Sequence, residues 1–210
     1  MTWPNIVITP GHTRQSPGAI NKTYGLSEHE ITKSIIEKVA DSYIRKDRRK
    51  AGYNLIAFTP NYTHRTYGDC LRAKFNDINE MNPSLILEFH FNAVASDEVV
   101  GSEMVSAPDM ASRKFAKYMM REFASYHKLL APDNKARRLF LPRRVVTPQD
   151  LGRDIFILDS AKYPTNIVEF SFLSTDVIAR QFMDRVFVTE LAWHIEDSLF
   201  DYARHNLLGD

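Results

Sequence analysis

The chain has 210 residues, and its 27 lysine and arginine side chains nearly balance its 26 aspartates and glutamates. Such a balance gives no general attraction to nucleic acid or to an anionic membrane surface, so neither is expected as a partner. Cys70 is the only cysteine, which excludes an intramolecular disulfide framework and a zinc finger. Apolar residues run from end to end, and the length suits one domain, 1–210, with one sizeable core.

The first residues, Met-Thr-Trp-Pro-Asn, form no basic leader, and no later apolar run is long enough to cross a membrane. We therefore expect no signal peptide, no membrane anchor and synthesis in the cytoplasm. Any substrate outside the cytoplasm would then be reached only after release of the protein.

Strands and helices are predicted to alternate along the first half of the chain. Ile6 to Ile8 is a β-branched run that Pro10 and Gly11 stop, which is typical of a buried strand. Ser27 can cap a helix, because Glu30 follows three positions later and apolar residues then recur at helical spacing. The predicted elements are a strand at 6–8, a helix from 28 to before 52, a strand at 53–58, a helix at 69–81 and a strand at 85–91.

The second half continues the alternation, which implies an α/β fold with a largely parallel sheet. The predicted elements are a strand after Gly101, a helix at about 110–126, a strand at 166–170 and a last helix after Asp176. Between them, residues 130–153 show little periodicity and predict a long loop that acts as a lid or groove wall. This loop carries four clustered arginines, Arg137, Arg138, Arg143 and Arg144.

His12, Glu28 and His90 are the candidate metal ligands. His12 lies just beyond a predicted strand, Glu28 in the first turn of the next helix, and His90 near the end of a later strand. In an α/β fold such positions converge at the carboxyl ends of the strands, and two imidazoles with one carboxylate form a standard catalytic zinc set. A histidine beside a strand is more often a satisfied structural residue, so position alone does not establish a ligand.

Alternation along the strand at 85–92 places three polar side chains on one face, namely Glu88, His90 and Asn92. The opposite face carries Leu85, Leu87, Phe89 and Phe91. Burial of three polar groups is costly unless they bind one another, a metal or a ligand. Glu88 is expected either to support a ligand histidine or to lie solvated at the rim of the sheet, and Asn92 is a second candidate for support or substrate contact.

Glu169 lies within an apolar predicted strand, where an unpaired carboxylate would be expensive. Burial raises the pKa of a carboxylate towards the range useful for a general base and then a general acid. The alternative is a structural ion pair, for which Arg153 and Arg72 are the candidate partners. The sequence leaves both interpretations open.

Five short motifs follow one another in order along most of the chain: Ile6-Val-Ile-Thr-Pro-Gly-His12, Ser16-Pro-Gly-Ala19, Gly25-Leu-Ser-Glu28, Phe89-His-Phe-Asn-Ala93 and Ile167-Val-Glu-Phe-Ser-Phe-Leu-Ser174. Together they resemble the Amidase_3 family of zinc-dependent N-acetylmuramoyl-L-alanine amidases. Leu71, Lys74 and Asn79 also fall where this family usually has a leucine, an arginine and an asparagine.

The resemblance implies a mixed, mostly parallel twisted sheet flanked by helices, with one Zn²⁺ per chain. It assigns the metal ligands to His12, Glu28 and His90 and the catalytic carboxylate to Glu169. The expected reaction is hydrolysis of the amide bond between N-acetylmuramic acid and L-alanine in peptidoglycan, and thus cell-wall lysis. We expect a monomer that resembles a phage endolysin, with the arginine cluster docking the free carboxylates of the stem peptide or simply solvated.

The sequence departs from the family pattern around the expected metal. Thr13 and Arg14 stand in place of two glycines, Ser16 in place of an aspartate, and Glu88 in place of a small residue. None of these changes removes a ligand or the base, so they affect the expected substrate contacts more than the chemistry. Two other functions remain open: a metallocarboxypeptidase-like or aminoacylase-like hydrolase of a smaller amide, and a catalytically silent wall-binding protein.

Overall fold

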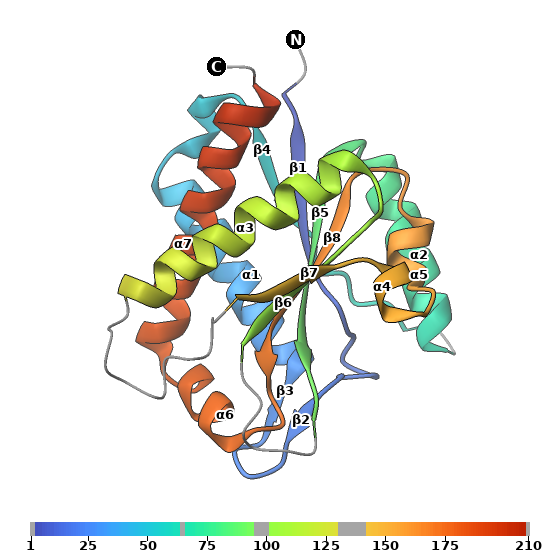
Figure 1. The fold of residues 1–210 in the computed structure, drawn as a ribbon, viewed down its shortest axis with the longest axis vertical. Helices are drawn as coiled ribbons and strands as arrows, with labels where there is room; N and C mark the ends of the chain where they lie inside the picture. Colours follow the sequence, from blue (N-terminus) through green and yellow to red (C-terminus); the bar gives the residue numbers. More distant parts are fainter. Residues whose placement is uncertain (1–2, 64–65, 95–100, 130–141, 209–210) are drawn as a thin grey trace.

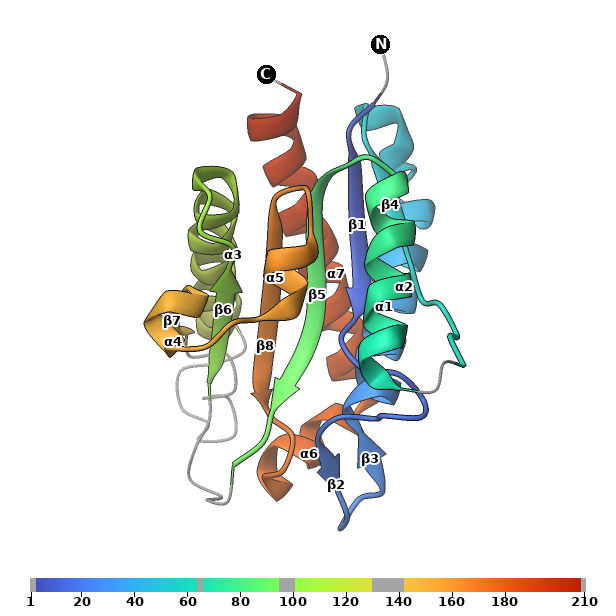
Figure 2. The same cartoon turned by 90° about the vertical axis from the view of Figure 1, so that its right-hand side faces the viewer.

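A six-stranded sheet runs through the computed structural model, which describes residues 3–63, 66–94, 101–129 and 142–208 (Figures 1 and 2). Its order is β4-β1-β5-β8-β6-β7. The bounds are β1 (Asn5–Pro10), β4 (Asn54–Ala57), β5 (Pro83–Asn92), β6 (Ser102–Ser106), β7 (Pro142–Val146) and β8 (Thr165–Phe172). All neighbouring pairs are parallel except β6 and β8, which confirms the predicted mixed, mostly parallel sheet in a single α/β domain.

Within the described ranges, seven helices flank this sheet on its two faces. They are α1 (Glu28–Arg45), α2 (Tyr67–Glu80), α3 (Met110–Leu129), α4 (Pro148–Leu151), α5 (Phe156–Ser160), α6 (Asp176–Phe182) and α7 (Arg185–Tyr202). The larger core cluster joins one sheet face to α1, α3, α6 and α7, and the smaller one joins the other face to α2 and α5. Figure 1 shows the sheet nearly edge-on, with α1 and α7 on one side and α2 and α5 on the other. None of the helices in the described ranges is long and apolar enough to cross a membrane.

Smaller elements complete the described chain. A two-stranded hairpin, β2 (Ile20–Asn21) and β3 (Leu26–Ser27), leads directly into α1. Short helical turns, Arg48–Ala51 and Ala203–Leu207, follow α1 and α7. The hairpin matters for the site, because it delivers the chain to the first turn of α1.

The alternation predicted for β5 is present. Leu85, Leu87, Phe89 and Phe91 belong to the core cluster beneath α1 and α3. Ile86 belongs to the opposite cluster, on the α2 side. Because side chains alternate along a strand, Glu88 and His90 lie on this second face, towards α2 and α5.

The segment 130–153 is not a continuous loop, so this part of the prediction was wrong. Residues 142–151 of this segment contain β7 and α4, and residues 130–141 lie outside the described part of the chain. β7 pairs with β6 at the sheet edge. Its sequence has little alternation of apolar and polar residues from which a strand could be predicted. α4 starts with a capping box between Thr147 and Asp150, followed by Pro148 in the first turn.

The end of the chain also differs from the prediction. The single helix expected after Asp176 is two helices, because α6 stops at Phe182 and Asp184 caps a new helix, α7. The side chain of Asp184 accepts from the backbone N–H groups of Val186 and Phe187. The short α5, inserted before β8, was not predicted.

Candidate metal centre

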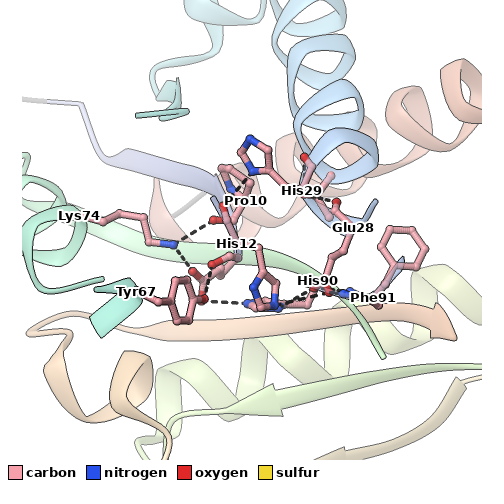
Figure 3. Close-up of polar contacts among 12 residues, drawn as sticks. Pro10, His12, Glu28, His29, Tyr67, Lys74, His90 and Phe91 are labelled. Atoms are coloured by element: carbon pink, nitrogen blue, oxygen red, sulfur yellow. Dashed lines mark hydrogen bonds and ion pairs between the residues drawn. The ribbon is translucent and has the colours of Figure 1, made fainter. Parts of the chain in front are cut away.

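Three residues from distant parts of the chain converge at the carboxyl ends of the central strands (Figure 3). His12 follows β1, Glu28 is the first residue of α1, and His90 lies near the end of β5. One ligand atom from each lies within 4.8 Å of the others. His12 Nε2 is 3.5 Å from Glu28 Oε2, and His90 Nδ1 is 2.9 Å from Glu28 Oε1.

The Glu28 carboxylate is held in place by backbone donors. The N–H of Ala19 donates to Oε2 at 2.8 Å, and the N–H of Phe91 donates to Oε1 at 2.9 Å. Burial raises the pKa of Glu28, but His90 and then His12 outweigh it, so the pKa lies below its ordinary value. The carboxylate is therefore ionised and oriented, as a metal ligand must be.

Two glycines allow the ligands to approach the backbone. A Cβ at Gly11 would lie 2.0 Å from the imidazole of His90, and a Cβ at Gly18 would lie 2.3 Å from Glu28 Oε2. Gly18 also has a φ of 76°, a conformation that side-chain-bearing residues rarely adopt. Both positions need glycine because the side chains of the candidate ligands fill the space that a Cβ would take.

His12 is positioned by two aromatic neighbours. The ring of Tyr67 stacks on its imidazole with centroids 5.4 Å apart, and the Tyr67 hydroxyl donates to the carbonyl of Gly11 at 2.8 Å. His29 Nδ1 lies 2.9 Å from the carbonyl oxygen of His12. Burial lowers the pKa of His12, which favours the neutral imidazole that binds metals.

His90 lies between two carboxylates. Its Nδ1 faces Glu28, and its Nε2 is 3.3 Å from Glu88 Oε2. Burial lowers the pKa of His90, but Glu28, Glu88 and Glu169 outweigh it and raise the pKa to about 10. Glu88 is fully buried and forms an ion pair with Lys74 of α2, so it is not a solvated residue at the sheet rim.

Glu169 lies beside His90 in the sheet, since the two are register partners of β8 and β5. Its Oε2 is buried and has no hydrogen-bond partner among the described residues. Burial is the main cause that raises the pKa of Glu169 to about 7, and nearby carboxylates add to it against the opposing effect of His90. The predicted alternative of an ion pair finds no support: Arg72 pairs with Asp69, and Arg153 forms no ion pair with Glu169.

Two adjacent hollows open beside Glu169. The first, of about 330 Å³, is lined by His90, Tyr67 and apolar residues of α2 and α5, and the second, of about 400 Å³, is lined by Asn92 and Arg144. The two hollows share Val105, Arg153 and Glu169. Glu169 thus lies at the border of both hollows.

The predicted arginine cluster is only partly described. Arg137 and Arg138 lie outside the described residues, as does the side chain of Arg143. Arg144 lines the second hollow, where its Nε donates to Glu103 at 3.2 Å. Arg153, which borders both hollows, was considered in the sequence only as a partner for Glu169.

The predicted site residues His12, Glu28, His90, Glu88 and Glu169 are therefore neighbours, and Asn92 lines the second hollow. Sequence reasoning assigned no role to His29 and did not consider Tyr67. It used Lys74 only to support the family register. A signal for Lys74 was available, because this lysine lies in the apolar stripe of Leu71, Phe75 and Ile78 that α2 buries.

Comparisons with known proteins agree with this geometry. The profile of the Amidase_3 family, N-acetylmuramoyl-L-alanine amidase, matches residues 6–201. A comparison with curated proteins gave no significant match.

Several solved structures have the same fold. An N-acetylmuramoyl-L-alanine amidase from Clostridium difficile 630 superposes with a TM-score of 0.74 at 18% identity, over 98% of this chain and 100% of that one. The catalytic domain of the amidase CwlV from Bacillus (Paenibacillus) polymyxa var. colistinus gives 0.72 at 19% identity, over 95% and 97%. The catalytic domain of the endolysin CD27L, which targets Clostridia difficile, gives 0.69 at 19% identity, over 97% of both chains.

The profile match extends over nearly the whole chain, and the matched segment contains all the residues that converge at the carboxyl edge of the sheet. The protein therefore belongs to the Amidase_3 family of N-acetylmuramoyl-L-alanine amidases.

Proposed function

We propose that this protein cleaves the amide bond between N-acetylmuramic acid and L-alanine in peptidoglycan, using one zinc ion bound by His12, Glu28 and His90. The observation that carries the proposal is the meeting of these three donors beside a carboxylate, Glu169, whose pKa is raised to about 7. A purely structural cluster would pair that carboxylate with a cation.

The donor set fits zinc. Two imidazole nitrogens and one carboxylate oxygen are the usual protein ligands of a catalytic zinc site, which keeps one position open. The backbone N–H groups on Glu28 and the glycines at positions 11 and 18 hold these donors close together. A zinc ion bound there would supply polarisation of the scissile carbonyl and activation of the attacking water.

Glu169 supplies the proton transfers. Its carboxylate takes a proton from the attacking water and then returns that proton to the leaving amine of the alanine. A pKa near 7 suits both steps at neutral pH, because the group accepts and releases a proton at similar cost. Glu169 lies between the two hollows. It can therefore reach the scissile bond of a substrate that places one part in each hollow.

Arg153 suits recognition of the stem peptide. Peptidoglycan stems carry free carboxylates, and a guanidinium binds a carboxylate through two parallel hydrogen bonds. Arg153 is exposed at the border of both hollows, and no ion pair occupies it within the described residues. We assign it to docking of a stem carboxylate, as the arginine cluster was expected to do.

The proposal is tested with purified peptidoglycan and metal analysis. The zinc-loaded protein should clear the suspension and release stem peptides that begin with a free L-alanine amine, and mass spectrometry should identify them. Fragments cut elsewhere in the stem would favour a carboxypeptidase-like or aminoacylase-like hydrolase. A protein that sediments with peptidoglycan without cutting it would be a silent wall-binding protein.

The same proposal includes the setting in which the enzyme acts. A monomer made in the cytoplasm and released at lysis would attack the wall as an endolysin does. Gel filtration of the purified protein with light scattering tests the monomer. To test whether release is needed, cell lysis by protein added to the medium is compared with cell lysis by the same protein produced inside the cells.

A further inference from the structure

The ammonium group of Lys74 lies between the two strands that carry the ligand histidines. Its Nζ donates to the carbonyl oxygen of Pro10 at 2.9 Å and forms a close ion pair with Glu88 Oε1 (Figure 3). Pro10 ends β1 two residues before His12, and Glu88 precedes His90 by two residues in β5. The Lys74 side chain of α2 therefore connects the end of β1, which leads to His12, with Glu88, which lies two residues before His90.

Glu88 extends this connection to the metal-binding imidazole. One of its oxygens contacts Lys74, and the other lies 3.3 Å from His90 Nε2. The opposite nitrogen of the same ring, Nδ1, faces Glu28 at 2.9 Å. The imidazole thus lies between two carboxylates, with Nδ1 at hydrogen-bond distance from Glu28 and Nε2 at ion-pair distance from Glu88.

The burial of this ion pair argues for a purpose other than stability. The side chain of Lys74 is 6% exposed and that of Glu88 is not exposed at all. Removing two charges from water costs several kcal/mol for each, and apolar residues of similar size often stabilise such a position equally well or better. Lys74 lies in an apolar stripe of α2, where a methionine would fit the surroundings.

We propose that Lys74 and Glu88 are positioning residues for the metal site. Glu88 orients the His90 imidazole towards the other proposed ligands, and Lys74 fixes both Glu88 and the end of β1 that leads to His12. A carboxylate on the outer nitrogen of a ligand histidine fixes the ring and strengthens the ligand. This inference rests on the proposed zinc site, and it adds the two residues that set the affinity of that site.

The test replaces the whole pair, because removal of Lys74 alone would leave a buried carboxylate uncompensated and destabilise the fold. The double variant Lys74→Met, Glu88→Leu keeps similar side-chain volumes without charges. We expect its metal-free form to unfold at the same denaturant concentration as the parent or a higher one. We expect its zinc affinity, measured by competition with a chromophoric chelator, to fall by about 10- to 100-fold.

A matched control removes a partly buried cation from a buried carboxylate elsewhere. Arg48→Met takes a cation from the Glu196 ion cluster between α1 and α7, which shares no residue with the metal site. This variant should lose stability and keep the parent zinc affinity. The double variant should therefore lose zinc affinity but not stability, whereas Arg48→Met should lose stability but not zinc affinity.

A second variant covers the case in which the double variant does not fold. Lys74→Gln, Glu88→Gln keeps polar side chains of similar size at both positions but removes both charges, and its zinc affinity should also fall. Parent affinity in the first double variant, or in this second one if the first is unfolded, would overturn the inference. A parent protein that binds no zinc would instead refute the proposed function, so the two failures are distinguishable.

Discussion

Two buried glutamates in this protein have opposite surroundings. Glu196 of α7 is fully buried, and its carboxylate contacts Lys46 at 2.9 Å, Arg48 at 3.2 Å and the hydroxyl of Ser42 at 3.2 Å. This cluster joins α7 to the end of α1 and the turn after it. All its contacts serve to neutralise one carboxylate and connect two helices.

Glu169 of β8 has no such compensation. Its neighbours in the sheet are His90 on one side and another carboxylate, Glu103, on the other. One oxygen has no hydrogen-bond partner in the described chain, and burial raises the pKa to about 7. The comparison teaches that a buried acid is structural when cations and donors satisfy it, and is a candidate for proton transfer when they do not.

The largest expected effect comes from Glu169→Gln. It removes the group that accepts and returns the proton, so the rate of amide hydrolysis should fall by about 10²- to 10⁴-fold. Zinc content, measured on the same sample, should equal that of the parent because Glu169 is not a proposed ligand. A variant that is fully loaded with zinc and cleaves at the parent rate would show that the two glutamates do not differ in the proposed way.

Arg48→Met tests the other side of the comparison. It removes one of the two cations on Glu196, together with the contact of the guanidinium with the Phe200 ring. Because Lys46 still pairs with the carboxylate, we expect a loss of about 2 kcal/mol in unfolding free energy, less than for an unpaired buried charge. Activity per folded molecule should not change, and a large loss of activity in the folded variant would mean that this cluster is not purely structural.

The pH dependence of stability should distinguish the two sites in the metal-free protein. Between pH 4.5 and about 7 the folded protein keeps a proton on Glu169 that the unfolded chain releases, so this group lowers stability as the pH rises. Glu169→Gln removes that effect. The unfolding free energy of the variant relative to the parent should therefore increase across this window and level off above it.

That difference is measured by denaturant unfolding at several pH values with a chelator present. The other titrating groups occur in both proteins and largely cancel below about pH 6.5. Above that pH the loss of Glu169 also changes the pKa of His90, which Glu169 helps to raise. A difference that stays constant from pH 4.5 to 8 would mean that the pKa of Glu169 is not raised.

The smallest expected effect concerns the edge of the site. Arg153→Gln should raise the KM for peptidoglycan fragments several-fold and leave kcat nearly unchanged, because a docking contact acts before the chemical step. The matched control is Arg45→Gln, at the end of α1 opposite Glu28, where the arginine is exposed and pairs with Asp41. An equal increase in KM from both substitutions would refute the assignment of Arg153 to substrate docking.

Periodicity predicted most of the elements that build the site. The alternation in β5 correctly separated Glu88 and His90 from the apolar face, and the cap at Ser27 correctly began α1 at Glu28. The segment at β7 and α4 was missed because an edge strand with one partner needs little apolar pattern, and the break between α6 and α7 depends on one capping residue, Asp184. Neither feature repeats often enough to be read as a period.

By itself the sequence determined the alternation of strands and helices and the two faces of β5, since these follow from repeats of two and 3.6 residues. The tertiary structure alone decided which charges pair. Nothing local distinguishes Glu196, neutralised by cations from the chain after α1, from Glu169, left without them, or shows that Lys74 reaches both Pro10 and Glu88. Pairing depends on distances between residues far apart in the chain, and only packing sets those distances.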